Sequence, residues 1–255
     1  MLDLPVRNFA DIIMIENTKQ RGIFMGERKL DKLFGIRTVG IREWPDNKIQ
    51  YNRYEPTPYK ALDELAENYR FRDVNKVVDF GCGRGRVAFY LHNRFHLPVT
   101  GIEANYKTYE EALQNKAIYR LKAEHIIAPI KFKYGLAQHY KIDKEDNCFY
   151  FFNPFSVHIF RKVVYNILRS VEKDRRTVDL IFYYPISEYK EFLTSTPFTM
   201  TNEIRVPGGS DKKEKFIIYR KTENRPPFYV LKQRTVPHSK KNFISLLHID
   251  KYIGR

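Results

Sequence analysis

The chain has 255 residues, of which 43% are hydrophobic and 15% aromatic, enough to build a sizeable core in one main domain. It has no run of about 20 apolar residues, the length that crosses a membrane, and its two cysteines are too few for a disulfide framework or a zinc cluster. The formal net charge is +15, and +8 of it falls in residues 201–255, where 13 Lys and Arg stand against 5 Asp and Glu. We therefore expect a soluble, cytoplasmic protein without a membrane span, and the basic C-terminal region makes nucleic acid a candidate partner.

The first 53 residues carry mixed charge and short strand-like runs such as GIRTVGIREW, so we expect an N-terminal appendage or lid at residues 1–53. The next stretch, YEPTPYKALDELAENY, places Thr57 before Pro58, as at the start of a helix. Apolar residues then follow at helical intervals. A helix is therefore predicted to lead into the central part of the chain.

From residue 76 onward, apolar strand-like runs alternate with amphipathic helical stretches. The expected strands are KVVDF, LPVTGIEA, PIKFKYG, CFYFFN and TVDLIFYYP, and the expected helices are GRVAFYLHNRF, YKTYEEALQNKAIYRLKAE and HIFRKVVYNILRSVEK. Apolar strands separated by amphipathic helices predict an α/β fold with a mostly parallel sheet covered on both faces. A short helix, SEYKEFL, and two strand-like runs around PGGSDKK then predict a C-terminal antiparallel hairpin.

The predicted organisation is thus one α/β domain at residues 54–221 and a basic C-terminal extension at residues 222–255. The stretch NFISLLHIDKYI predicts a short helix in this extension, and we expect the extension to pack on the body of the protein.

The stretch VVDFGCGRGR lies between the first strand and the next helix of the α/β domain, at the edge of the sheet where ligands bind. A Cβ atom at Gly81, Gly83 or Gly85 would block both a tight turn and the close approach of a ligand. A dinucleotide fingerprint requires a glycine where Arg86 stands, and the carboxylate of Asp79 would repel a pyrophosphate. These residues disfavour an NAD-dependent oxidoreductase and favour a positively charged ligand.

This stretch resembles the first motif of the class I S-adenosylmethionine-dependent methyltransferases, an apolar strand that ends in acid-x-G-x-G-x-G. The resemblance implies S-adenosyl-L-methionine as the cofactor, with the acid beside its ammonium group and the glycine backbone beneath its ribose and methionine parts. It also implies a Rossmann-like, doubly wound sheet of the seven-stranded methyltransferase type, finished by the hairpin. The residues of the motif assigned to the cofactor are Asp79, Phe80, Gly81, Cys82, Gly83 and Gly85.

Glu103 ends the next predicted strand, 18 residues after Gly85. A carboxylate at this point can accept hydrogen bonds from both ribose hydroxyls, and Ala104 would line the adenine side. After the third strand the family often has an acid that binds adenine, and here Gln138 takes its place. Tyr54 and Thr57 would contact the cofactor if the leading helix covers it, and would otherwise serve helix capping and packing.

The fourth strand ends in Asn153, Pro154 and Phe155. These residues resemble the Asn/Asp-Pro-Pro-Tyr/Phe motif of amino-group methyltransferases, one proline short. We assign them to the catalytic, acceptor-binding side of the site, and Asn153 also to the cofactor. The shorter loop follows a different backbone path, so the carbonyl that faces the acceptor is not carried over. An amine needs no strong general base, whereas an oxygen acceptor would make His139 and His158 the candidate bases.

The sequence therefore predicts an S-adenosylmethionine-dependent methyltransferase without a metal site. Its acceptor is an amine or a macromolecular or phosphate-bearing molecule of undefined class. A non-catalytic nucleic-acid-binding protein on the same fold is the alternative, and an NAD-dependent oxidoreductase is a weaker one.

Overall fold

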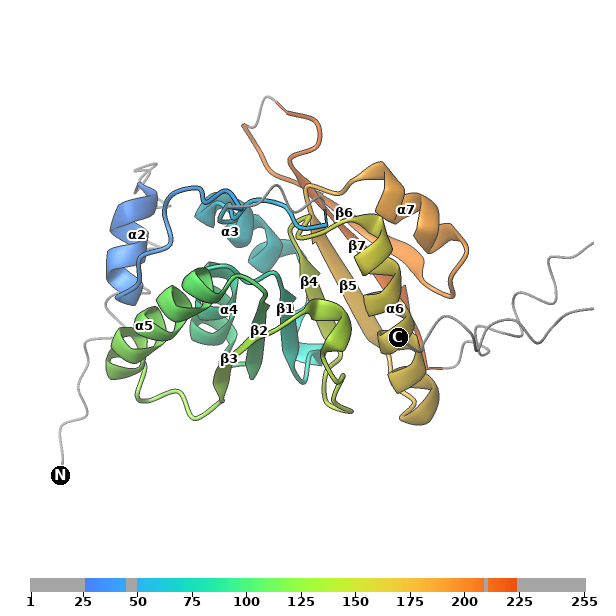
Figure 1. Ribbon diagram of the computed structural model, residues 1–255, viewed down its shortest axis with the longest axis horizontal. Helices are drawn as coiled ribbons and strands as arrows, with labels where there is room; N and C mark the ends of the chain where they lie inside the picture. Colours follow the sequence, from blue (N-terminus) through green and yellow to red (C-terminus); the bar gives the residue numbers. More distant parts are fainter. Residues whose placement is uncertain (1–25, 45–49, 209–210, 224–255) are drawn as a thin grey trace, which may run out of the picture.

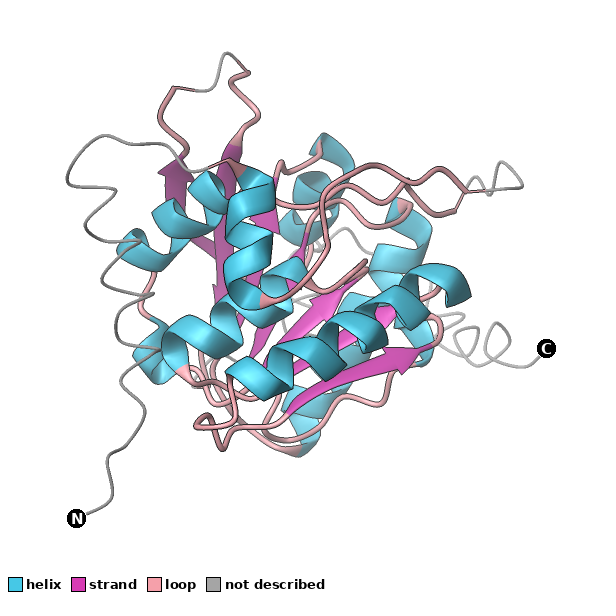
Figure 2. Cartoon of the chain, turned by 90° about the vertical axis from the view of Figure 1, so that its left-hand side faces the viewer, coloured by secondary structure: helices cyan, strands magenta, loops and turns pink. Residues whose placement is uncertain are grey.

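The computed structural model describes residues 26–44, 50–208 and 211–223, and forms a central sheet with helices packed on both faces (Figures 1 and 2). The helices are α2 Glu27–Phe34, α3 Tyr59–Asn68, α4 Arg86–Phe95, α5 Tyr106–Lys122, α6 Val157–Lys173 and α7 Ser187–Thr194, with short 3₁₀ turns at Phe71–Asp73 and Ala137–His139. The strands are β1 Val77–Phe80, β2 Val99–Glu103, β3 Ile130–Tyr134, β4 Cys148–Phe151, β5 Val178–Tyr183, β6 Thr199–Arg205 and β7 Lys215–Lys221.

The sheet has the strand order β3-β2-β1-β4-β5-β7-β6. Strands β1 to β5 run parallel, and β7 and β6 are added antiparallel as the predicted hairpin. The strand order reverses between β1 and β4, which pair directly, so that Phe80 lies opposite Phe151 at their carboxyl ends. Ligands of open α/β sheets bind at such a switch point, and here the turns after β1 and β4 meet there.

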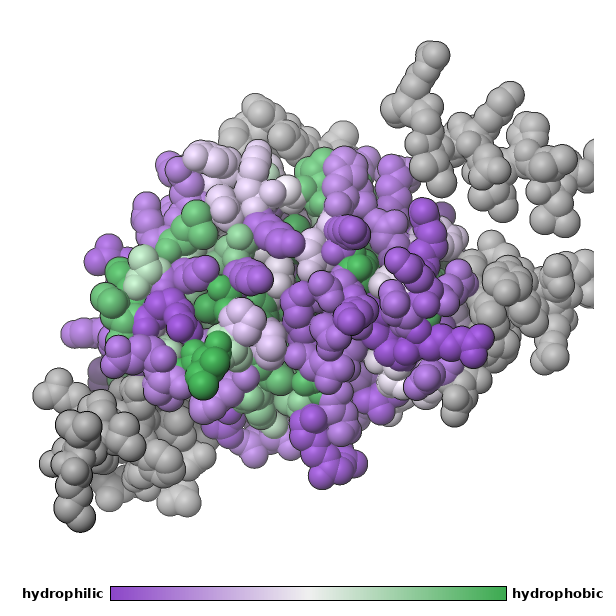
Figure 3. All heavy atoms as spheres, turned by 90° about the horizontal axis from the view of Figure 1, so that it is seen from below, coloured by the Kyte–Doolittle hydropathy of each residue, from purple (hydrophilic) through white to green (hydrophobic). Residues whose placement is uncertain are grey.

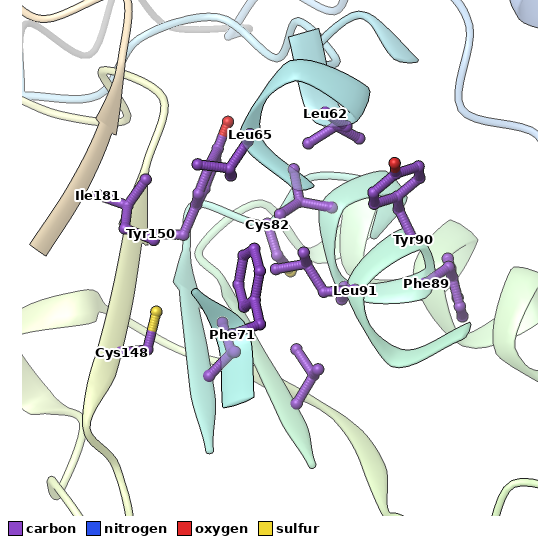
Figure 4. Packing of buried hydrophobic residues seen from close by; sticks show 14 of the residues in the cluster. Leu62, Leu65, Phe71, Cys82, Phe89, Tyr90, Leu91, Cys148, Tyr150 and Ile181 are labelled. Carbon is purple, nitrogen blue, oxygen red and sulfur yellow. The ribbon is translucent and has the colours of Figure 1, made fainter. Parts of the chain in front are cut away.

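Two hydrophobic clusters cover the two faces of the sheet because successive strand residues point to opposite sides. Val77 of β1 packs in the cluster with α3, α4 and α5, and Figure 4 shows how Leu62 and Leu65 of α3 and Phe89 of α4 contribute to it. Val78 belongs to the other cluster, with α6 and α7. The central strands β1, β2, β4 and β5 are buried along their whole length, as the continuous apolar runs predicted.

The segment after α2 differs from its prediction. The run GIRTVGIREW does not form a strand; its one ladder contact within the described residues is an isolated bridge between Arg42 and Tyr54. Side chains take up its backbone N–H groups instead, since Thr38 and Val39 donate to the Asp31 carboxylate, and Arg37 donates to a side chain of α5. Helix α2, which the sequence did not predict, carries that aspartate.

The start of α3 also differs. Pro58 occupies the N-cap position and no side chain caps the helix, so the prediction of Thr57 as the N-cap was wrong. Thr57 is buried, and its hydroxyl lies 2.8 Å from the hydroxyl of Tyr150 on β4. The Thr57 side chain therefore hydrogen-bonds to Tyr150 instead of capping the helix.

The helix predicted in NFISLLHIDKYI and nearly all of the basic extension lie outside the described residues. No helix in the described part of the chain is long and apolar enough to cross a bilayer. Both cysteines are buried and unbridged.

Candidate functional site

The glycine turn follows β1 and leads into α4. Gly81, Gly83 and Gly85 have φ values of +74°, +55° and +92°, a region that side chains rarely adopt. A Cβ on Gly83 would overlap the ring of Tyr54, and a Cβ on Gly81 would overlap Pro154. The turn therefore requires glycine both for its backbone and for the residues that pack on it.

Asp79 precedes this turn within β1. Its side chain is 2% exposed, and Oδ2 has no hydrogen-bond partner among the residues that the structure describes. Burial, and to a lesser degree the carboxylate of Glu103, raise the pKa of Asp79 to about 8. A buried carboxyl oxygen without a partner is costly, and a cationic group beside it would remove that cost.

Glu103 ends β2 and is 7% exposed. Its Oε2 accepts a hydrogen bond from the N–H of Gly83 at 2.9 Å, and its Oε1 accepts one from the N–H of Asn105 at 2.7 Å. Burial raises the pKa of Glu103, and these N–H groups act against that rise. The N–H of Ala104 also acts on this carboxylate, which is thus fixed in orientation and keeps lone-pair capacity for a further donor.

A pocket of about 60 Å³ lies beside the glycine turn. Its walls include several of the predicted site residues: Tyr54, Gly81, Glu103, Ala104, Pro154 and Phe155. Ligand pockets usually measure roughly 300–1,000 Å³, so this one is nearly closed. Tyr54 lies on Gly83, and its hydroxyl donates to the carbonyl of Thr38.

Other predicted site residues lie behind or beside these walls. Phe80 is fully buried and stacks on Phe151 at a centroid distance of 5.4 Å, so only its backbone is near the turn. Cys82 is buried against Gly101 of β2. Gln138 does not line the pocket; its carbonyl accepts from the side chain of Asn166, and its Oε1 has no partner within the described chain.

The pocket is lined by the strap, residues 50–55, which lies at the end of the segment predicted as an appendage or lid; the sequence did not predict its contacts with the loop after β4. In Figure 1 the segment that follows α2 runs across the top of the sheet. Asn52 ties the strap to the loop after β4: its Nδ2 donates to the carbonyl of Asn153 at 2.6 Å and its N–H donates to that of Pro154 at 3.1 Å. Tyr51 forms an isolated bridge with Phe155. The strap therefore engages the backbone carbonyls of Asn153 and Pro154, in the loop after β4 (residues 153–155), the NPF loop.

Asn153 has a φ of +40°, and its Oδ1 has no hydrogen-bond partner among described residues. It lies not in the small pocket but in an adjoining cleft of about 860 Å³, on the other side of the strap. The described residues that line this cleft are Glu43, Trp44, Tyr51, Asn52, Arg53, Glu55, Pro58, Phe152, Asn153, Tyr183, Tyr184 and Glu214. The six residues common to the pocket and the cleft are Trp44, Tyr51, Asn52, Arg53, Glu55 and Phe152.

Arg86, which stands where a dinucleotide fingerprint has its last glycine, is 3% exposed. Its Nε donates to the Thr38 hydroxyl at 2.6 Å, and its guanidinium forms ion pairs with Asp31 and Glu27 of α2. The arginine therefore fastens α2 and the segment after it to the start of α4. His139 and His158 are exposed and line neither the pocket nor the cleft.

Sequence comparison with models of protein families gives no match, and comparison with curated proteins gives none. Among solved structures, the human methyltransferase 10 domain containing protein is similar over 77% of this chain and 93% of its own, with a TM-score of 0.51 and 14% identity. An RNA methyltransferase from Salinibacter ruber, in complex with S-adenosyl-L-homocysteine, is similar over 68% of this chain and 97% of its own, with a TM-score of 0.48 and 15% identity. At such identities a likeness shows the fold alone, and we base the fold on the human protein.

The strand order, the final antiparallel pair and this likeness agree with one another. The chain therefore has the Rossmann-like fold of the class I S-adenosylmethionine-dependent methyltransferases.

Proposed function

We propose that the protein binds S-adenosylmethionine at the glycine turn and transfers its methyl group to an acceptor held beside the NPF loop. One observation carries this proposal: the buried carboxyl of Asp79, whose Oδ2 has no partner among described residues, stands at the switch point of a methyltransferase-type sheet. The ammonium group of the cofactor is a cation that would pair with it. The fixed carboxylate of Glu103, with its remaining lone pairs, suits the ribose hydroxyls.

The chemistry of these residues suits the cofactor, whereas the pocket, at about 60 Å³, is too small to hold it. The strap would therefore move away from the glycine turn to admit the cofactor and cover it afterwards, which would exclude water. We accordingly propose that residues 1–53 act as a lid on a domain at residues 54–221, and that the strap, at the junction of the two, is the part that moves. When bound, the cofactor would supply a methyl group already activated by its sulfonium.

The chain's own contribution would be orientation. Asp79 would hold the ammonium end, Glu103 the ribose, and the loop from Asn153 to Phe155 the acceptor. Phe80, Cys82 and Gly85 would support the turn from behind it. Thr57 would act through Tyr150 rather than by direct contact, and Gln138 would serve the adenine side only after a change of side-chain position.

These contacts give no support to an NAD-dependent oxidoreductase. A dinucleotide fingerprint requires a glycine where Arg86 stands, and Arg86 forms ion pairs with α2 there. We further propose a cytoplasmic location, and nucleic acid as a partner of the basic C-terminal region.

Calorimetric titration with S-adenosylhomocysteine at about pH 6.5 tests the cofactor site. Asp79 is mostly protonated there if its pKa is about 8, and an ammonium group beside it would drive its proton off. We expect release of close to one proton, measured as a dependence of the binding heat on the ionisation enthalpy of the buffer.

The Asp79→Asn variant should bind more weakly and release no proton at this site. Absence of binding by the wild type, or equal binding by the Asn variant, would reject the proposed cofactor site. Transfer of labelled methyl from S-adenosylmethionine to fractions of a cell extract then tests the activity, with Glu103→Ala as the variant expected to lose it.

A further inference from the structure

The cleft beside the strap has a chemical character opposite to that of the whole chain. The protein has a net charge of +15, yet the described residues that line the cleft include three carboxylates, Glu43, Glu55 and Glu214, and one cation, Arg53. We infer that this cleft binds a polypeptide segment through its lysine or arginine side chains. The inference rests on the proposed function, because it names the class of acceptor that would reach Asn153.

The single arginine does not balance the three acids. Arg53 lies 3.1 Å from a carboxylate oxygen of Glu55 and 3.7 Å from one of Glu43, so its charge is already shared between two glutamates. Glu214 accepts a hydrogen bond from the hydroxyl of Tyr183 at 3.2 Å and has no ion pair with any described residue. A surplus of negative charge therefore remains along the cleft, and it would attract cations and repel phosphates.

Aromatic rings form much of the remaining wall. Trp44 and Tyr51 pack together at a centroid distance of 5.3 Å on the N-terminal side, and Phe152 packs on Tyr183 at 4.8 Å at the ends of β4 and β5. The face of such a ring attracts an ammonium or guanidinium group that lies over it. Rings alone would also stack a nucleobase, and the carboxylates are what favour a cationic side chain over a nucleic acid.

Two backbone features mark the floor of the cleft as a ligand site. Asn153 and Tyr184, which follow β4 and β5, have φ values of +40° and +51°, in the left-handed region that non-glycine residues rarely occupy. Such conformations concentrate at binding sites. The Oδ1 of Asn153 is buried and has no partner among described residues, so an N–H donor of a bound side chain would satisfy it once the amide turns toward the cleft.

The size of the cleft favours a polypeptide over a small amine. At about 860 Å³ it lies at the upper end of the ligand-pocket range. Its carboxylates come from two separate parts of the chain: Glu43 precedes the strap and Glu55 ends it, whereas Glu214 directly precedes β7. A segment with several cationic side chains would engage both parts at once, whereas a single ammonium group would engage one.

Fluorescence anisotropy of the full chain with labelled peptides tests the inference. The probes are a short peptide of alternating lysine and serine, a matched peptide of glutamate and serine, and a short single-stranded RNA. We expect the lysine peptide to bind the wild type, with an affinity that falls as salt is added. The double variant Glu43→Lys/Glu214→Lys should weaken this binding by roughly tenfold or more.

The matched control is Glu172→Lys, at an exposed glutamate near the end of α6 and outside the cleft lining, which makes the same kind of charge change. The variant Glu43→Gln/Glu214→Gln, which removes charge without reversing it, should give an intermediate loss and covers the case in which the reversed variant does not fold. Lysine peptide affinity that is unchanged in both double variants, or no greater than that of the glutamate peptide, would overturn the inference. So would RNA that binds the wild type and competes with the lysine peptide.

Titration of the same proteins with S-adenosylhomocysteine separates this inference from the proposed function, because Glu43 and Glu214 do not line the small pocket. Cofactor binding without peptide binding would reject the peptide cleft alone. Peptide binding without cofactor binding would reject the proposed function and, with it, the assignment of the peptide as a methyl acceptor.

Discussion

At the scale of single residues, the site depends on two buried acids, Asp79 and Glu103, that differ in their hydrogen-bond partners. Glu103 accepts two backbone N–H groups, whereas Oδ2 of Asp79 accepts none from the described chain. The two carboxyls also repel each other, which helps to raise the pKa of Asp79. A pKa of about 8 makes Asp79 predominantly neutral in the free protein at pH 7, and on our proposal it ionises when the cofactor's ammonium group binds beside it.

The titration of Asp79 makes the stability of the free protein depend on pH. Its pKa is about 8 in the folded state against 3.8 ordinarily, so between these values the folded state holds a proton that the unfolded state has lost. The free energy of unfolding therefore falls as pH rises through this window. Relative to the wild type, Asp79→Asn should gain about 3 kcal/mol between about pH 5 and about pH 8.

Urea unfolding of both proteins at the two pH values measures this gain. Titrating groups that do not interact with Asp79 are common to the two proteins and cancel in the comparison. A difference in stability that stays constant with pH would show that the pKa of Asp79 is not raised in the folded protein.

Gly83 tests how tightly the strap packs on the glycine turn. Alanine at this position meets both the positive φ of +55° and the ring of Tyr54, and should cost about 1–3 kcal/mol of stability. In the background of Tyr54→Ala the clash is gone and the φ strain remains, so the cost should fall by about 1 kcal/mol. Denaturant unfolding of the four proteins gives this coupling.

A matched control is Gly26→Ala, where a Cβ meets nothing within 4 Å. Its effect should be smaller than that of Gly83→Ala and independent of Tyr54. A cost at Gly83 that is the same with and without Tyr54 would mean that the tyrosine ring does not rest on the turn.

At the scale of elements, the strap and α2 form one covering unit with different attachments at its two ends. Arg86 fastens the α2 end through a buried ion pair with Asp31 and a partly exposed one with Glu27. Exposed hydrogen bonds from Asn52 fasten the other end to the loop after β4. Buried charge pairs are costly to break, whereas exposed hydrogen bonds are weak. Opening for a ligand should therefore begin at Asn52 and leave α2 in place.

Asn52→Ala should consequently loosen the strap without unfolding the domain. We expect the association rate of S-adenosylhomocysteine to rise several-fold, because the closed state is less favoured. Stopped-flow fluorescence of Trp44, the single tryptophan and a residue of the pocket wall, provides the signal.

Asn68→Ala serves as the control, since Asn68 is also exposed and its Nδ2 also donates to a backbone carbonyl. It should leave the association rate unchanged. An equal rate for Asn52→Ala and the wild type would mean that the strap does not limit entry.

At the scale of the whole molecule, the fold and one side of the site follow from local sequence patterns. The five parallel strands, their helices and the final hairpin were predicted from periodicity, and the fold is confirmed. Asp79 was assigned from the glycine motif that follows β1, and Glu103 from its place at the end of the next strand. The attachment of the strap to the loop after β4 could not be predicted from local patterns. The hydrogen bond between Asn52 and Asn153 joins residues 101 apart in the chain and leaves no periodic signal.

Two further features of the whole molecule escaped the sequence for similar reasons. From the sequence, Arg86 was notable only as the residue that replaces the last glycine of a dinucleotide fingerprint. Its role in ion pairs was not predicted because its partners lie on α2, a helix that was itself not predicted. The total charge gave no hint of the acidic cleft, whose glutamates come together only in the fold. The underside of the molecule is largely hydrophilic with some hydrophobic side chains (Figure 3), and Leu121 and Ile127 are exposed apolar residues that line neither the pocket nor the cleft.

Hydrogen exchange of the full chain, with and without S-adenosylhomocysteine, tests most directly whether the cofactor binds at the switch point beneath the strap. We predict slower exchange in peptides that cover residues 79–86, 101–106 and 50–55, and little change along β6 and β7. Protection confined to other segments, or no protection anywhere at saturating S-adenosylhomocysteine, would contradict the proposed site.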